Sequence, residues 1–130
     1  MKMYTSRWFT TGAIVLIISG CASSPKFVAV PRDLDRSKVT LQTIDLTARD
    51  YSFTPDVIRV KPGTLLRLVL KSTEGTHGFR LGDFGIDERL DEGREKVVEV
   101  YLPTPGEYGF RCSHFCGLGH FGMTGKIIVE

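Results

Sequence analysis

The chain of 130 residues has no excess of positive or negative charge after position 20. It also has no apolar run long enough to span a membrane as a helix. Only two of its 17 Lys and Arg residues, Lys2 and Arg7, precede position 21, and all 15 Asp and Glu residues follow it. Residues 21–130 therefore carry 15 basic against 15 acidic side chains, which excludes a nucleic-acid-binding protein that relies on positive charge. A chain of this length with 42% hydrophobic residues indicates one small domain.

The first 20 residues have the pattern of a signal peptide that is removed before Cys21. Two basic residues precede an apolar run over 9–18, which is far shorter than the roughly 20 residues of a membrane-spanning helix. The run ends in Ile18-Ser19-Gly20-Cys21, which resembles a bacterial lipobox. That resemblance implies an exported protein, acylated at Cys21 and held by lipid to the bacterial cell envelope, at the periplasmic or outer face of a membrane. A plain secretory signal is the alternative.

Residues 21–40 read as a flexible tether, because they combine serines and prolines with alternating charges and little apolar periodicity. Residues 41–130 form the domain, in which apolar residues recur at every second position, as at Leu66, Leu68 and Leu70. This alternation indicates half-buried strands, separated by Pro- and Gly-rich turns. The sequence predicts an all-β Greek-key sandwich or barrel of about seven short strands, closed by a strand over 124–129.

The loop before that last strand contains Cys112, Cys116, His120 and Met123, spaced as C-x3-C-x3-H-x2-M. Thiolate, thioether and imidazole together favour copper over zinc or calcium. His77, at a predicted strand end, can reach the same end of a sandwich. One copper would need two His, one Cys and a weak Met, which leaves one Cys over, whereas two coppers bridged by both thiolates would use every soft side chain.

Five stretches of the domain resemble the dinuclear copper A domain of cytochrome c oxidase subunit II, a cupredoxin that shares its ligand loop with nitrous oxide reductase. They are A-R-D-Y-S-F-T-P, V-K-P-G-T, H-G-F-R-L-G-D-F-G-I, P-G-E-Y-G-F-R-C and C-S-H-F-C-G-L-G-H-F-G-M-T-G-K-I-I-V. The resemblance implies two copper ions bridged by Cys112 and Cys116. It also implies terminal imidazoles from His77 and His120 and a weak axial ligand from Met123. His114 stands where the family usually has Glu and would contribute its main-chain carbonyl.

This resemblance implies an electron carrier in respiratory electron transfer, which is not an enzyme alone. A subunit of a cytochrome c oxidase-type complex is the other reading of it. Its implied partners are a c-type cytochrome or another donor and an oxidase or another terminal acceptor, with the membrane reached through the lipid anchor. An envelope copper carrier or storage protein and a mononuclear cupredoxin remain alternatives. A Cys112–Cys116 disulfide and a zinc site that includes His114 are further alternatives for the loop.

Two more features bear on partners. The only Trp of the chain is Trp8, so the tryptophans that the family commonly has where electrons enter are missing, and Tyr51 and Phe53 are the candidates to replace them.

Residues 83–99 hold seven acidic against three basic side chains. This segment is expected to be a solvated loop leading into a strand, or else a docking surface for a cationic partner.

Overall fold

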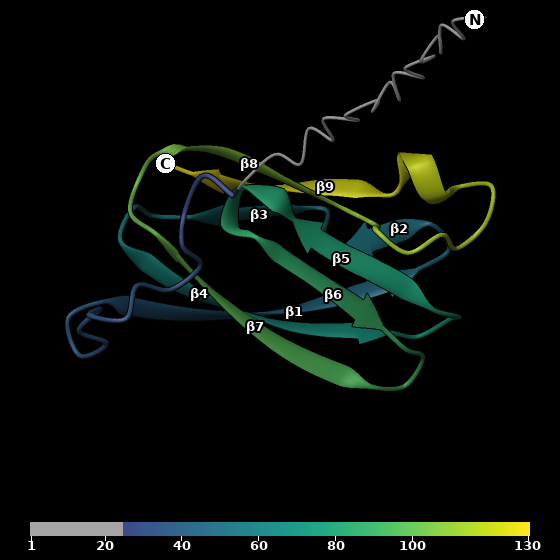
Figure 1. The fold of residues 1–130 in the computed structure, drawn as a ribbon, viewed down its shortest axis with the longest axis horizontal. Helices are drawn as coiled ribbons and strands as arrows, with labels where there is room; N and C mark the ends of the chain where they lie inside the picture. The colour runs from purple at the N-terminus through teal and green to yellow at the C-terminus, as the bar shows by residue number, and fades with distance from the viewer. Residues whose placement is uncertain (1–24) are drawn as a thin grey trace, which may run out of the picture.

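The computed structural model describes residues 25–130, so the predicted signal peptide and the acylation site Cys21 lie outside the described residues. Nine strands make up the fold, with two single-turn 3-10 helices between them (Figure 1). The strands are β1 (Thr40–Arg49), β2 (Ser52–Thr54), β3 (Val57–Val60), β4 (Thr64–Ser72), β5 (His77–Leu81), β6 (Ile86–Leu90), β7 (Glu95–Leu102), β8 (Gly106–Arg111) and β9 (Thr124–Val129). The short helices are η1 (Gly82–Phe84) and η2 (His120–Gly122).

The strands form two sheets that face each other as a sandwich (Figure 1). One sheet has the order β2-β1-β4-β7, and the other has the order β3-β9-β8-β5-β6. The pairs β1–β4 and β3–β9 are parallel, and the remaining neighbours are antiparallel. The predicted all-β sandwich is confirmed, and the predicted closing strand over 124–129 is β9.

The apolar alternation in the sequence marks the face of each strand that points into the sandwich. In β4, Leu66, Leu68 and Leu70 have no exposed surface, and Val100 and Phe110 are buried on β7 and β8. The rings of Phe53, Phe79 and Phe110 pack with centroids 5.2 to 6.1 Å apart in the middle of this core. Burial of these side chains is the main source of stability in such a fold.

Residues 25–39, which belong to the predicted tether, contact the domain at several points. Phe27 stacks on Phe84 with ring centroids 5.2 Å apart, and its N–H donates to the carbonyl of Asp83. The N–H of Tyr101 donates to the carbonyl of Ala29 over 2.7 Å. The described part of this segment therefore lies against the sandwich.

The acidic residues of segment 83–99 lie on or near β6 and β7, where most of them have basic neighbours. Glu99 is the most enclosed of these, because it accepts two hydrogen bonds from Arg67 and one from Arg36. These two guanidinium groups, Arg36 first, hold the pKa of Glu99 below its usual range. The acidic segment is thus largely neutralised locally.

Within residues 25–130, none of the helices is long and apolar enough to cross a membrane.

Candidate metal centre

The candidate metal ligands come from two parts of one sheet that the strand order brings to the same end of the sandwich. His77 is the first residue of β5, and Cys112 follows directly after the last residue of β8. Since β5 and β8 are neighbours, with Arg80 opposite Arg111, His77 lies beside the loop that joins β8 to β9. Cys116 lies within this ligand loop, residues 112–123, and His120 begins its short helix η2.

The sulfur and nitrogen atoms of this loop lie close enough to share metal ions. The Sγ atoms of Cys112 and Cys116 are 3.7 Å apart, well beyond the roughly 2.05 Å of a disulfide bond, and both cysteines are free. Cys116 Sγ lies 3.8 Å from Nδ1 of His120. Ligand atoms at about 2.0–2.3 Å from a tetrahedral ion lie roughly 3.5 Å from one another, so these separations suit a metal site.

His77 presents one ring nitrogen to this group in the form that binds a metal. Its Nε2 lies 2.8 Å from the carbonyl oxygen of Glu74, which can only accept a hydrogen bond. Nε2 must therefore carry the proton, which leaves a lone pair on Nδ1. Nδ1 is buried, in a residue that is only 4% exposed, and it has no hydrogen-bond partner among the described residues. A buried nitrogen of this kind costs free energy unless something binds it, and a metal ion fits that need.

The ligand atoms of His77, Cys112 and Cys116 all lie within 4.8 Å of one another. His120 does not belong to that group, although it lies close to Cys116. Cys116 is therefore the sulfur that lies near both candidate imidazoles.

The backbone around Cys112 holds its sulfur in position. Gly78 of β5 donates its N–H to Cys112 Sγ over 3.4 Å, and the Cys112 thiol lies 3.1 Å from the carbonyl oxygen of His114. The N–H of Cys112 donates to the carbonyl of Met123 over 2.9 Å, which ties the two ends of the loop together. Met123 is fully buried beside the site. The His114 carbonyl oxygen thus lies beside the Cys112 sulfur.

Burial has a direct effect on the second thiol. The low polarity of its surroundings, together with the neighbouring Cys112, raises the pKa of Cys116 to about 11. The thiol is then protonated at neutral pH in the metal-free protein. A bound cation deprotonates a coordinating thiol, so a metal would reverse this preference. The donor set is therefore suited to a soft metal ion such as copper.

Glycine is required at Gly78, where β5 passes the ligand loop. A Cβ there would lie 2.3 Å from Ser113 Oγ and 2.5 Å from the main-chain nitrogen of His114. His77 was predictable as a candidate ligand from the sequence, but the roles of Gly78 and of the Glu74 carbonyl were not. Both are main-chain contacts, which residue type does not reveal.

The two aromatic residues that were candidates to replace the missing tryptophans have different environments. Phe53 is 3% exposed and belongs to the core, so it packs in the interior. Tyr51 is 44% exposed. Its ring lies directly against the ligand loop, so close that a Cβ added at Gly117 or Gly119 would collide with it. Tyr51 therefore supports the ligand loop from outside.

The loop also exposes large apolar side chains. Phe115, Leu118 and Phe121 are 67%, 99% and 85% exposed, whereas most other apolar residues of this size are buried. The ring centroids of Phe115 and Phe121 lie 5.6 and 5.2 Å from the centroid of the His120 imidazole. Exposed apolar groups gathered in this way mark a contact surface.

The chain is similar to several known proteins. Residues 12–129 match the family described as a cupredoxin-like domain. Cytochrome c oxidase subunit 2 of Thermus thermophilus is 31% identical over 88 residues, which cover 68% of this chain and 65% of that protein. Nitrous-oxide reductase of Ralstonia nicotianae is 28% identical over 92 residues, which cover 68% of this chain and 14% of the enzyme. The chain thus spans less than two thirds of the length of these relatives.

A solved structure shows the same fold. The periplasmic domain of subunit II of cytochrome oxidase from Bradyrhizobium japonicum superimposes with a TM-score of 0.63 over 68% of this chain and 83% of that domain, at 19% identity. The His and Cys side chains described above form a candidate metal site within this fold. The chain belongs to the cupredoxin-like family, with a domain homologous to that of cytochrome c oxidase subunit II.

Proposed function

We propose that this protein is an electron carrier with a dinuclear copper A centre, which acts in respiratory electron transfer. The observation that carries the proposal is the placement of the two free thiols between two imidazoles. Cys116 Sγ is shared between the group of His77 and Cys112 and the contact with His120. A sulfur placed near both imidazoles supports a pair of ions that would share it.

The residues suit such a centre in their chemistry as well as in their spacing. The buried Nδ1 of His77 and the Nδ1 of His120 are the terminal donors, Cys112 and Cys116 are the thiolates, and Met123 and the His114 carbonyl are the weak donors. A copper pair bridged by thiolates accepts and releases one electron with little change in bond lengths. The protein's part is to hold the ligands rigid, which the Gly78 and Glu74 contacts do.

The loop surface supplies a way for electrons to reach the site. Phe115, Leu118 and Phe121 form an apolar patch around His120, where a redox partner can dock without displacing strongly hydrated charges. We propose a c-type cytochrome or another donor as one partner and a terminal oxidase as the other. The matched relatives include an oxidase subunit, which supports the second assignment.

The proposal includes attachment to the cell envelope through an acyl group on Cys21. The basis is the sequence Ile18-Ser19-Gly20-Cys21 after a short apolar run. Two or more acyl chains anchor a protein stably, because each buried methylene contributes about 0.8 kcal/mol. Mass spectrometry of the protein from the membrane fraction should show an acylated Cys21 at its amino terminus, and an unmodified terminus would contradict the anchor.

The ligand assignment is tested by replacing each thiol in turn. We expect Cys112→Ser and Cys116→Ser each to bind fewer than two coppers per chain and to lose the reversible one-electron couple in voltammetry. Ser37→Ala, an exposed residue of segment 25–39 outside the ligand loop, is the control and should bind copper like the parent. Two coppers in both Cys variants would refute the assignment. Copper that exchanges readily in the parent, with no reversible couple, would instead indicate a copper carrier.

A further inference from the structure

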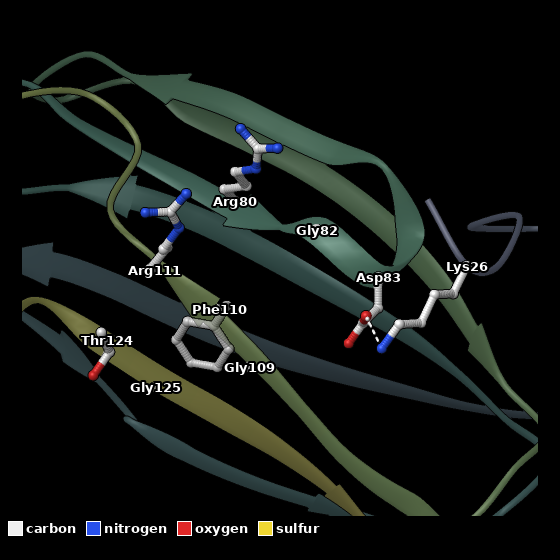
Figure 2. A pocket seen from close by; sticks show the side chains of 9 residues that line it. All are labelled: Lys26, Arg80, Gly82, Asp83, Gly109, Phe110, Arg111, Thr124 and Gly125. Atoms are coloured by element: carbon white, nitrogen blue, oxygen red, sulfur yellow. Dashed lines mark ion pairs between the residues drawn. The ribbon is translucent and has the colours of Figure 1, made fainter. Parts of the chain in front are cut away.

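A groove on the outer side of the five-stranded sheet carries an unusual concentration of positive charge (Figure 2). It has a volume of about 530 Å³, within the range of small-molecule sites, and opens to solvent. Lys26, Arg80 and Arg111 line it, and among residues 25–130 the one acidic residue of its lining is Asp83. We propose that this groove binds an oxyanion of the phosphate class, supplied either by an anionic phospholipid headgroup or by free phosphate.

The two arginines oppose each other across the sheet. Arg80 and Arg111 are register partners on β5 and β8, and Figure 2 shows their guanidinium groups beside each other at one end of the groove. Like charges directly opposite on neighbouring strands are unfavourable unless an anion lies between them. Arg111 has no ion-pair partner among residues 25–130, and Arg80 is 3.6 Å from Asp87, beyond hydrogen-bond distance.

The other end of the groove contributes a third positive charge. Lys26 lies 3.2 Å from Asp83, and Figure 2 shows this ion pair away from the arginines. With Asp87 beside Arg80, the three basic groups and two acids leave a net charge of +1, which matches the single negative charge of a phosphodiester headgroup or of a phosphate monoanion. Guanidinium groups bind phosphate oxygens in a bidentate manner, which two adjacent arginines can do together.

Three glycines stand in the lining of the groove, and one of them, Gly109, leaves space open in front of it. Gly82, Gly109 and Gly125 all line it. A Cβ at Gly109 would meet no atom within 4 Å, so this position opens onto free space. The pairing between strands is also short on one side of the groove: β5 and β8 share one register pair, whereas β8 and β9 share six.

The position of the groove in the chain favours the headgroup as its occupant. Lys26 is five residues after Cys21, a reach of at most about 17 Å when extended. This source rests on the lipid anchoring proposed above, since an acylated Cys21 would keep Lys26 near the headgroups. The chemistry of the groove itself does not depend on the anchor.

The test uses the fragment 22–130, which contains the whole two-sheet core and carries no acyl group. One arm titrates inorganic phosphate by calorimetry at low ionic strength, with acetate as the carboxylate comparison. The other arm measures sedimentation with vesicles of phosphatidylglycerol or of phosphatidylcholine. The variant is Arg80→Gln with Arg111→Gln, and the matched control is Arg59→Gln, which changes an exposed arginine of the same sheet outside the groove.

We expect the parent to bind phosphate and to bind it more tightly than acetate, and the double variant to lose this binding. Each basic group near an anionic membrane contributes about fivefold in affinity, so removing two should weaken binding to phosphatidylglycerol vesicles about 25-fold. Arg59→Gln should change it much less. Preference for phosphatidylglycerol over phosphatidylcholine assigns the site to headgroups, and phosphate binding without that preference assigns it to free phosphate.

Several results would overturn the proposal. The parent could fail to bind phosphate and also show no preference for phosphatidylglycerol vesicles. It could bind acetate as tightly as phosphate. The double variant could keep the parent's preference for phosphatidylglycerol. Thermal unfolding checks that the double variant is folded, and Arg111→Gln alone replaces it if it is not. Copper content is measured on the same samples, so a failure of the copper proposal is seen separately from a failure of the groove.

Discussion

Replacing Gly78 by alanine tests how closely the ligand loop is fitted to the sheet. The added Cβ would lie 2.3 Å from Ser113 Oγ and 2.5 Å from the main-chain nitrogen of His114. The hydroxyl can rotate away, but the backbone nitrogen cannot, so the loop must move by about an ångström to reach ordinary contact distance. Overpacking of this kind costs about 1–3 kcal/mol. The shift also lengthens the hydrogen bond from the Gly78 N–H to Cys112 Sγ.

We therefore expect Gly78→Ala to lower the free energy of unfolding by about 2–3 kcal/mol and to weaken copper retention. Urea unfolding of the metal-free protein gives the first quantity, and the rate of copper loss to a chelator gives the second. Gly109→Ala is the matched control, because its Cβ meets nothing within 4 Å, and its stability should change by less than about 1 kcal/mol. Equal stability and equal copper loss in the parent and Gly78→Ala would refute the reasoning.

Three further changes have defined outcomes. Met123→Leu should keep both coppers but shift the reduction potential in voltammetry, because it removes only a weak donor; loss of one copper would contradict this. Glu99→Gln should cost about 1 kcal/mol at pH 7. The lowered pKa of Glu99 means that its stabilisation is complete above the unfolded pKa and is lost as pH falls through the folded pKa. Urea unfolding at pH 7 and pH 3 should therefore show the difference from the parent shrinking in acid, and a constant difference would contradict it. Tyr51→Ala should speed copper loss to a chelator about tenfold, because it uncovers the ligand loop; a loss of about 1.4 kcal/mol of packing corresponds to that factor. Tyr51→Phe keeps the ring and should lose copper at the parent's rate. Equal rates in Tyr51→Ala and the parent would contradict the supporting role of Tyr51.

The strands were predictable from the sequence because burial in a sandwich imposes a period of two. Leu66, Leu68 and Leu70 follow that period and are fully buried. The last strand was predictable to the residue, since glycines precede it and apolar residues alternate within it. The ligand loop was recognisable because soft side chains are rare and are concentrated in it.

The contacts that fix the site were not predictable in the same way. The hydrogen bond from the Gly78 N–H to Cys112 Sγ joins residues 34 positions apart, and the Glu74 carbonyl acts through its main chain. Neither depends on a side chain, so residue types carry no trace of them. The stacking of Phe27 on Phe84 has no sequence signal for a different reason, because a single aromatic residue within a polar segment shows no periodicity.

The most direct test of the copper A proposal is the metal content of the fragment 22–130 after reconstitution with copper, measured together with its electron paramagnetic resonance spectrum. We predict two coppers per chain and a hyperfine pattern in which one unpaired electron is shared by both nuclei. One copper per chain with hyperfine splitting from a single nucleus would contradict the dinuclear centre, as would no bound copper with Cys112 and Cys116 oxidised to a disulfide.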